Sequence, residues 1–129
     1  MDSHVLVVDD SAAIRKILQR VLRQTGMAIG EIHEAGDGQE ALALMAEHPV
    51  HLVLSDINMP KMDGLQLLAS LKNSANWKNI PVVMITTEGG EAKVSEAVRL
   101  GAAGYVRKPF TADQIKEKLT GLLEPVLPL

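Results

Sequence analysis

The chain has 129 residues, no cysteine, 2% aromatic residues and a formal net charge of −3. This length suits a single domain. The lack of cysteine excludes disulfides and thiolate metal ligands. The negative net charge and the few aromatic side chains argue against binding to nucleic acid. Because no apolar run approaches the roughly 18 residues of a membrane span, and the N-terminus lacks the basic start of a signal peptide, we expect a cytoplasmic protein without membrane insertion.

The first half of the chain alternates apolar runs with helical patterns. The run at 4–8 is mostly β-branched and ends at Asp9-Asp10, which indicates a strand. Ser11 is a good N-cap for a helix predicted at 12–24. A weaker strand at 31–35 and a helix at 39–47 follow. The apolar spacing predicts inward faces made of Ile14, Ile17, Leu18, Val21 and Leu22 in the first helix, and of Ala41, Leu42, Leu44 and Met45 in the second.

The second half repeats this alternation. The apolar run 51–54 indicates a strand buried on both faces, and it stops at Asp56. A helix is predicted from about Gly64, a strand at 81–85, a helix ending near 100, a strand at 105–107 and a helix from about Thr111. The packing residues predicted for these helices are Leu65, Leu68 and Leu71, then Val94, Ala97 and Val98, and finally Ile115, Leu119, Leu122 and Leu123.

Five strands alternating with five helices predict an α/β fold with helices on both faces of a parallel sheet. Right-handed crossovers leave few topologies, and one of them has the strand order 2-1-3-4-5. We expect one domain over 1–129, with its core at about 4–124 and a short proline-containing tail at 125–129.

Polar residues follow four of the predicted strands, at the edge of the sheet where ligands bind in such folds. These residues are Asp9, Asp10, Asp56, Thr86 and Lys108. Three carboxylates placed close together repel one another unless a cation compensates them, and hard oxygen ligands suit Mg²⁺. A carboxylate beside that ion can attack a phosphoryl group and form an acyl phosphate. The convergence therefore predicts phosphoryl chemistry at this edge.

With the motifs Asp9-Asp10, Asp56, Thr86 and Lys108-Pro109, the chain resembles the receiver domains of bacterial two-component response regulators. The stretches DINMPKMDG and VRKPF are most similar to the stand-alone chemotaxis (CheY-like) type, and the resemblance covers about residues 4–124. Ile57 departs from that type, which often has an aromatic residue at this position. The resemblance is consistent with the 2-1-3-4-5 order, for which CheY is itself a standard example.

The resemblance implies a role for each matching residue. Asp56 would accept the phosphoryl group, with Lys108 and Thr86 contacting it. Asp10, Asp56 and the backbone carbonyl of Asn58 would bind Mg²⁺, or alternatively Mn²⁺, and Asp9 would act mainly through water. Thr86 and Tyr105 would form the switch, while Asn58 and Glu88 would tune dephosphorylation. The Lys108–Pro109 peptide would be cis.

The resemblance also implies partners rather than an independent enzyme. The phosphoryl donor would be a sensor histidine kinase or a phosphotransfer protein. A downstream effector, such as the flagellar motor, would bind a monomer through the surface formed by the helix ending near 100, the strand at 105–107 and the last helix.

Two rival functions fit parts of the same pattern. A haloacid-dehalogenase-like phosphohydrolase also uses a nucleophilic Asp, Mg²⁺ and a Lys, but it needs an acid–base carboxylate two residues after the nucleophile, where this chain has Asn58. A flavodoxin-like cofactor binder would need a phosphate-binding loop after the first strand, where Asp9 and Asp10 would repel the phosphate.

Three further groups of residues have simpler interpretations. The basic helix face of Arg15, Lys16, Arg20 and Arg23 is either a solvated face or a docking site for a kinase. The histidines His4, His33, His48 and His51 share no metal-ligand spacing, which favours ordinary surface residues. The methionines Met45, Met59, Met62 and Met84 are predicted to pack in the core and in turns.

Overall fold

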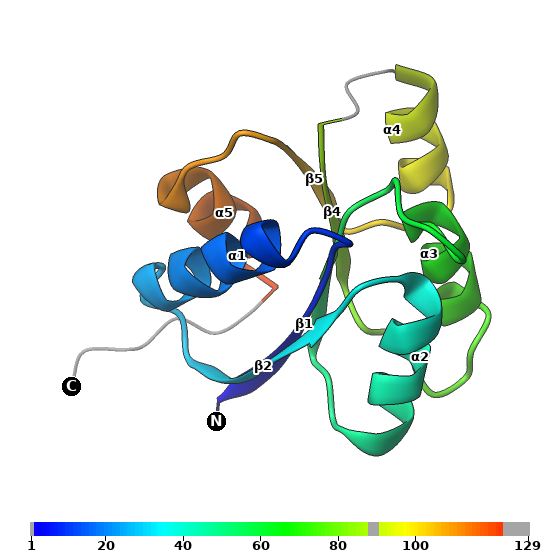
Figure 1. Ribbon diagram of the computed structural model, residues 1–129, viewed down its shortest axis with the longest axis horizontal. Helices are drawn as coiled ribbons and strands as arrows, with labels where there is room; N and C mark the ends of the chain where they lie inside the picture. Colours follow the sequence, from blue (N-terminus) through cyan, green and yellow to red (C-terminus); the bar gives the residue numbers. More distant parts are fainter. Residues whose placement is uncertain (1, 88–90, 123–129) are drawn as a thin grey trace.

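The computed structural model describes residues 2–87 and 91–122 as five strands alternating with five helices (Figure 1). The strands are β1 (Ser3–Val8), β2 (Ile29–Ala35), β3 (Leu52–Ser55), β4 (Val82–Thr86) and β5 (Gly104–Arg107). The helices are α1 (Ala12–Gln24), α2 (Gly38–Glu47), α3 (Gly64–Lys72), α4 (Glu91–Arg99) and α5 (Ala112–Leu119). Among the described residues, no helix is long and apolar enough to cross a membrane.

The strands form one parallel sheet in the order β2-β1-β3-β4-β5, which confirms the predicted topology. α1 and α5 cover one face of the sheet, and α2, α3 and α4 cover the other (Figure 1). Because side chains alternate across a strand, β1 contributes Val5 and Val7 to the α1/α5 core, and Leu6 and Val8 to the opposite core. β1 and β3 lie side by side, so the residues that follow them meet at one edge.

The predicted helix starts agree with the structure because their capping residues act locally. The Ser11 side chain accepts a hydrogen bond from the Ile14 amide at 3.3 Å. Thr111 forms a capping box with Gln114, in which each side chain accepts a hydrogen bond from the other residue's backbone.

Several elements begin or end one residue from their predicted bounds, and two differ by more. β2 begins at Ile29 rather than 31, because Ile29 is buried and pairs with Ser3 of β1. α5 ends at Leu119, since Thr120 is extended and Gly121 has a φ of 93°. Leu122 still packs against the α1/α5 core, but from outside the helix. Leu123 and the tail lie outside the described residues.

Two predicted core residues are exposed. Val98 of α4 is 63% exposed, because the inward stripe of this helix is narrow and centred on the buried Ala97. Ile17 of α1 is 37% exposed, since α1 buries the face containing Leu18 and Leu22 instead. The apolar spacing identified both helices correctly but overestimated the width of their buried faces.

The basic face of α1 is only partly solvated. Lys16 and Arg20 are exposed. Arg23 donates hydrogen bonds to the carbonyls of Ile29 and Gly30 at 2.8 and 2.7 Å, and Arg15 pairs with residues at the other end of the sheet. Whether a kinase docks on this face stays a prediction.

The histidines form two stacked pairs, which the sequence did not predict. The ring centroids of His4 and His51 are 5.4 Å apart, and those of His33 and His48 are 4.6 Å apart. His48 and His51 are exposed as predicted, whereas His4 and His33 are half-buried. Within the described ranges, none of them belongs to a group of three potential metal ligands.

The four methionines pack as predicted. Met45 and Met84 are buried, and Met59 and Met62 pack against the α2/α3/α4 core from the loop after β3.

Lys72 at the end of α3 was not predicted to have a structural role. Its ammonium group donates hydrogen bonds to the carbonyls of Lys78 and Ile80 at 3.1 and 3.2 Å, which holds the polar loop before β4. Burial lowers the pKa of Lys72 below its ordinary value.

Candidate functional site

Three carboxylates converge at the edge of the sheet where the strands end. Asp9 and Asp10 follow β1, Asp56 follows β3, and one ligand atom from each lies within 4.8 Å of the others. They form the only such group of potential metal ligands in the part of the chain that the structure describes. The predicted meeting of the ends of β1 and β3 is therefore confirmed.

The three carboxylates differ in burial and in their hydrogen bonds. Asp9 is 2% exposed, and its Oδ1 accepts a hydrogen bond from the Ser11 amide at 2.9 Å. Asp56 is 9% exposed, and its Oδ1 accepts from the Ile57 amide at 2.7 Å. Asp10 is exposed, and its side chain has no hydrogen bond or ion pair to any described residue. Asp10 is thus the carboxylate most open to an added ligand.

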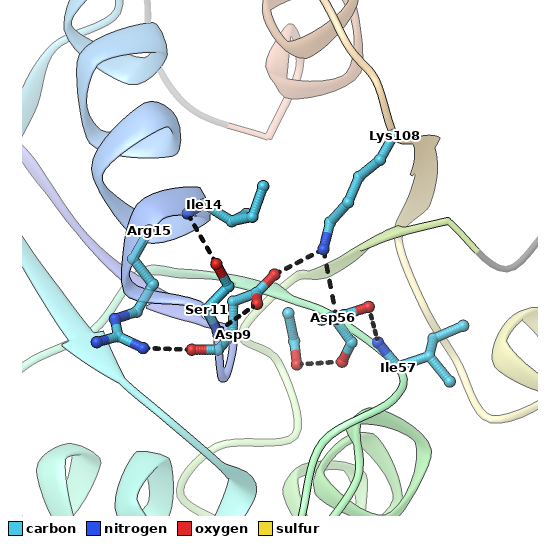
Figure 2. A network of polar contacts seen from close by, with 8 residues as sticks. Asp9, Ser11, Ile14, Arg15, Asp56, Ile57 and Lys108 are labelled. Atoms are coloured by element: carbon cyan, nitrogen blue, oxygen red, sulfur yellow. Dashed lines mark hydrogen bonds and ion pairs between the residues drawn. The ribbon is translucent and has the colours of Figure 1, made fainter.

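Lys108 neutralises part of this negative charge (Figure 2). Its Nζ lies 2.7 Å from Oδ2 of Asp9 and 3.3 Å from Oδ2 of Asp56. The Lys108 side chain is only 12% exposed, so these contacts are weakly screened. The cluster therefore has an internal cation, and the shorter contact is to Asp9 rather than to Asp56. The peptide between Lys108 and Pro109 is cis, as the resemblance implied.

The oxygen ligands fit a hard divalent cation. Three carboxylates against one ammonium group leave a net negative charge, and Mg²⁺ prefers oxygen donors together with retained water. Asp10 is exposed beside the buried Asp56, so its carboxylate oxygens are accessible to such an ion. Asn58, whose carbonyl was predicted to contribute, lies in the exposed loop that follows Asp56.

Thr86 and Tyr105 project toward the same face of the sheet. β4 alternates between the two cores, with Val83 and Ile85 in the α1/α5 core, so Thr86 belongs to the opposite face. Val106 of β5 packs in the α1/α5 core, so Tyr105 also belongs to the opposite face. Thr86 is fully buried, and the register pairs Met84 with Tyr105, which makes Thr86 and Tyr105 diagonal neighbours.

A pocket of about 630 Å³ runs beside β5 and α5, and Tyr105 lines it with Gln114, Glu117 and Lys118. Tyr105 itself is half-buried rather than fully solvated. Glu88, the predicted tuning residue, lies outside the described residues.

The comparisons with known proteins agree with this geometry. Residues 5–120 match the family of response regulator receiver domains. The chain belongs to this family. One similar relative is the probable chemotaxis protein CheY of Rhizobium etli, which is 41% identical over an alignment covering 87% of this chain and 85% of the relative. Another is chemotaxis protein CheY1 of Helicobacter pylori, which is 41% identical over 92% of this chain and 95% of the relative.

Solved receiver structures share the fold. CheY4 of Vibrio cholerae superposes with a TM-score of 0.85 at 33% identity, covering 95% of this chain and 100% of its own. A CheY of Borrelia burgdorferi, solved in a complex with CheX, BeF₃ and Mg²⁺, has a TM-score of 0.84 at 30% identity. The match covers 93% of this chain and 88% of that structure's chain. Phosphorylation-dependent signalling is accordingly the expected function of this receiver.

Sequence reasoning missed several residues around the site. Ile57, which departs from the chemotaxis type, is 1% exposed and packs in the α2/α3/α4 core, while its amide orients Asp56. Arg15 contacts the backbone of Asp9 and the side chain of Glu34. A basic residue one helical turn after Asp9-Asp10 was visible in the sequence, but its partner on β2 depends on the strand order.

Proposed function

We propose that Asp56 is the phosphoacceptor of this receiver, with a phosphohistidine of a sensor kinase or a phosphotransfer protein as donor. The observation that supports this most is the Asp56 carboxylate itself, which lies at the end of a central strand beside Lys108 and two further carboxylates. Asn58 lacks the acid–base carboxylate that a phosphohydrolase would need at that position, which favours a signalling protein over an independent enzyme.

The transfer is a displacement at phosphorus. A carboxylate oxygen of Asp56 forms the new P–O bond while the P–N bond of the donor breaks and the donor imidazole takes up a proton. The Ile57 amide holds one carboxylate oxygen of Asp56, and Lys108 is placed to pair with a phosphoryl oxygen. Asp10, Asp56 and the carbonyl of Asn58 would hold Mg²⁺, with Asp9 contacting it through water. When bound, Mg²⁺ supplies the positive charge that phosphoryl oxygens require.

Replacing Asp56 with asparagine tests the acceptor assignment. Wild-type protein incubated with acetyl phosphate and Mg²⁺ is expected to gain one phosphoryl group, whereas Asp56→Asn gains none because an amide is not a competent nucleophile. Intact mass spectrometry measures both, and chelation of Mg²⁺ serves as a second control. Undiminished labelling of Asp56→Asn would show that another residue is the acceptor.

We further propose that the phosphoryl signal reaches an effector through α4, β5 and α5. Support comes from Thr86, which is buried at the end of β4, and from Tyr105 on the same face of the neighbouring strand. A phosphoryl oxygen accepting from the Thr86 hydroxyl would draw that side chain toward Asp56, and Tyr105 would follow into the space. The names of the relatives support a role in chemotaxis. We propose that a monomer of this chain acts in the cytoplasm and binds a downstream effector, such as the flagellar motor.

The α1 surface supports a docking site for the donor. A pocket of about 360 Å³ lies between α1 and the segment after β5, and Ile17, Phe110 and Lys108 line it. Because Ile17 is exposed close to the acceptor site, we expect Ile17→Ser to slow transfer from a phosphohistidine donor but not from acetyl phosphate. The ratio of the two rates is the measurement, and an unchanged ratio would remove this face from the donor interface.

A further inference from the structure

The Asp10 side chain is not positioned by a hydrogen bond or an ion pair to any described residue. Asp9 beside it is held by the Ser11 amide and by Lys108, but the Asp10 carboxylate is exposed and makes no such bond to a described residue. The direction of the Asp10 side chain therefore depends on its backbone, because Cα sets where Cβ points.

Arg15 fixes that backbone. Its guanidinium Nη1 donates a hydrogen bond at 2.5 Å to the carbonyl oxygen of Asp9 (Figure 2). This oxygen belongs to the peptide unit between Asp9 and Asp10, which is planar, so holding the oxygen also holds the amide and Cα of Asp10. Arg15 lies one helical turn after Ser11, and its own amide donates to the Ser11 carbonyl at 3.1 Å.

Glu34 of β2 holds the guanidinium from the other side. Arg15 Nε lies 3.0 Å from Glu34 Oε1, and the two side chains are 19% and 36% exposed. Arg15 thus joins three elements that lie apart in the sequence: the end of β1, the first turn of α1 and the edge strand β2. The planar fork of arginine permits two simultaneous hydrogen bonds in fixed directions, which a lysine ammonium group on a flexible chain does not reproduce.

We propose that Arg15 is a positioning residue for the Mg²⁺ site, acting through the Asp9–Asp10 peptide. This inference rests on the proposed function of the acidic cluster. The direction in which Mg²⁺ affinity changes on replacing Arg15 tests this role, because the charge of Arg15 disfavours Mg²⁺ binding and its hydrogen bond favours it. A cation near the cluster repels Mg²⁺, so removing the charge alone would strengthen metal binding. Removing the hydrogen bond that orients Asp10 would weaken it.

Mg²⁺ titration of the unphosphorylated protein, followed by calorimetry, separates the two effects. Outer-shell partners of metal ligands typically contribute 10–100-fold in affinity, and because Arg15 acts through the backbone we expect Arg15→Gln to raise the Kd for Mg²⁺ about tenfold. Arg15→Lys loses the fork but keeps the charge that repels Mg²⁺, so its Kd is expected to rise at least as much. A Kd that is unchanged or lower in Arg15→Gln would overturn the proposal.

Arg23→Gln is the matched control. Arg23 is on the same helix and also donates to backbone carbonyls, but it contacts Ile29 and Gly30 at the opposite end of β2. We expect this variant to melt at a lower temperature than wild type with an unchanged Mg²⁺ Kd, so an equal loss of affinity in Arg23→Gln would also overturn the positioning role. Failure of the wild-type protein to bind Mg²⁺ would instead contradict the metal site of the proposed function. That result differs from one in which wild type binds Mg²⁺ and Arg15→Gln binds it equally well, which contradicts only the role of Arg15.

Discussion

Replacement of Gly64 with alanine is expected to lower the free energy of unfolding by about 3 kcal/mol, because a side chain at this position has no space. Gly64 is the first residue of α3, and a Cβ there would lie 2.0 Å from the carbonyl oxygen of Asp56 and 2.8 Å from the Cε of Met84. The Asp56 oxygen is backbone, so it can yield only if the acceptor residue itself moves. Urea denaturation measures the loss, and the rate of labelling by acetyl phosphate should fall as well.

Gly104→Ala provides the control for this substitution. A Cβ at Gly104 in β5 would meet nothing closer than a methyl group of Val83 at 3.8 Å, which is ordinary contact. We expect the free energy of unfolding to rise by about 0.5 kcal/mol, because alanine loses less conformational freedom on folding than glycine. If Gly64→Ala were as stable as Gly104→Ala, the close approach of α3 to the Asp56 carbonyl would be wrong.

Lys108→Met is expected to cost about 3 kcal/mol in metal-free protein, because it leaves two buried carboxylates without their shared cation. Asp9 and Asp56 have side chains only 2% and 11% exposed, so water can screen little of their repulsion. Mg²⁺ at millimolar concentration should restore part of this loss, since a bound cation replaces the missing charge. The increase in melting temperature caused by Mg²⁺ should therefore be larger in Lys108→Met than in wild type.

Lys116→Met removes the same charge from an exposed position on α5 and serves as the comparison. It should melt close to wild type, with the same Mg²⁺-induced increase. Equal Mg²⁺ shifts in Lys108→Met and Lys116→Met would show that Lys108 does not compensate the acidic cluster. Without metal, the contacts of Lys108 already compensate part of the charge of the acidic cluster.

The arrangement of the site was predictable because it depends on strand order rather than on side-chain detail. Short apolar runs buried on both faces indicated a parallel sheet. The order 2-1-3-4-5, one of the few that right-handed crossovers leave and the one that the resemblance implies, then placed Asp9, Asp10 and Asp56 at one edge. Helix starts were predictable for a related reason, since Ser11 and Thr111 cap their helices through contacts three residues away.

The contacts between distant elements were not predictable from the sequence. Arg15 is spaced like a solvated residue of an amphipathic helix, and only the placement of β2 beside β1 brings Glu34 within its reach. The exposure of Ile17 and Val98 has a similar cause, because helical spacing gives the direction of an apolar face but not how far the sheet extends beneath it.

The most direct test of phosphorylation-dependent switching is the environment of Tyr105, followed by NMR in free protein and in protein with Mg²⁺ and beryllofluoride, a mimic of the aspartyl phosphate. We expect the ring signals of Tyr105 to shift in wild type and to remain near their free positions in Thr86→Ala, because the hydroxyl that would link Asp56 to Tyr105 is missing. Coupling between such sites is typically about 1–3 kcal/mol, enough to change the populations of the two states visibly. An identical Tyr105 environment in free and beryllofluoride-bound wild type would contradict the switch, even if Asp56 is phosphorylated.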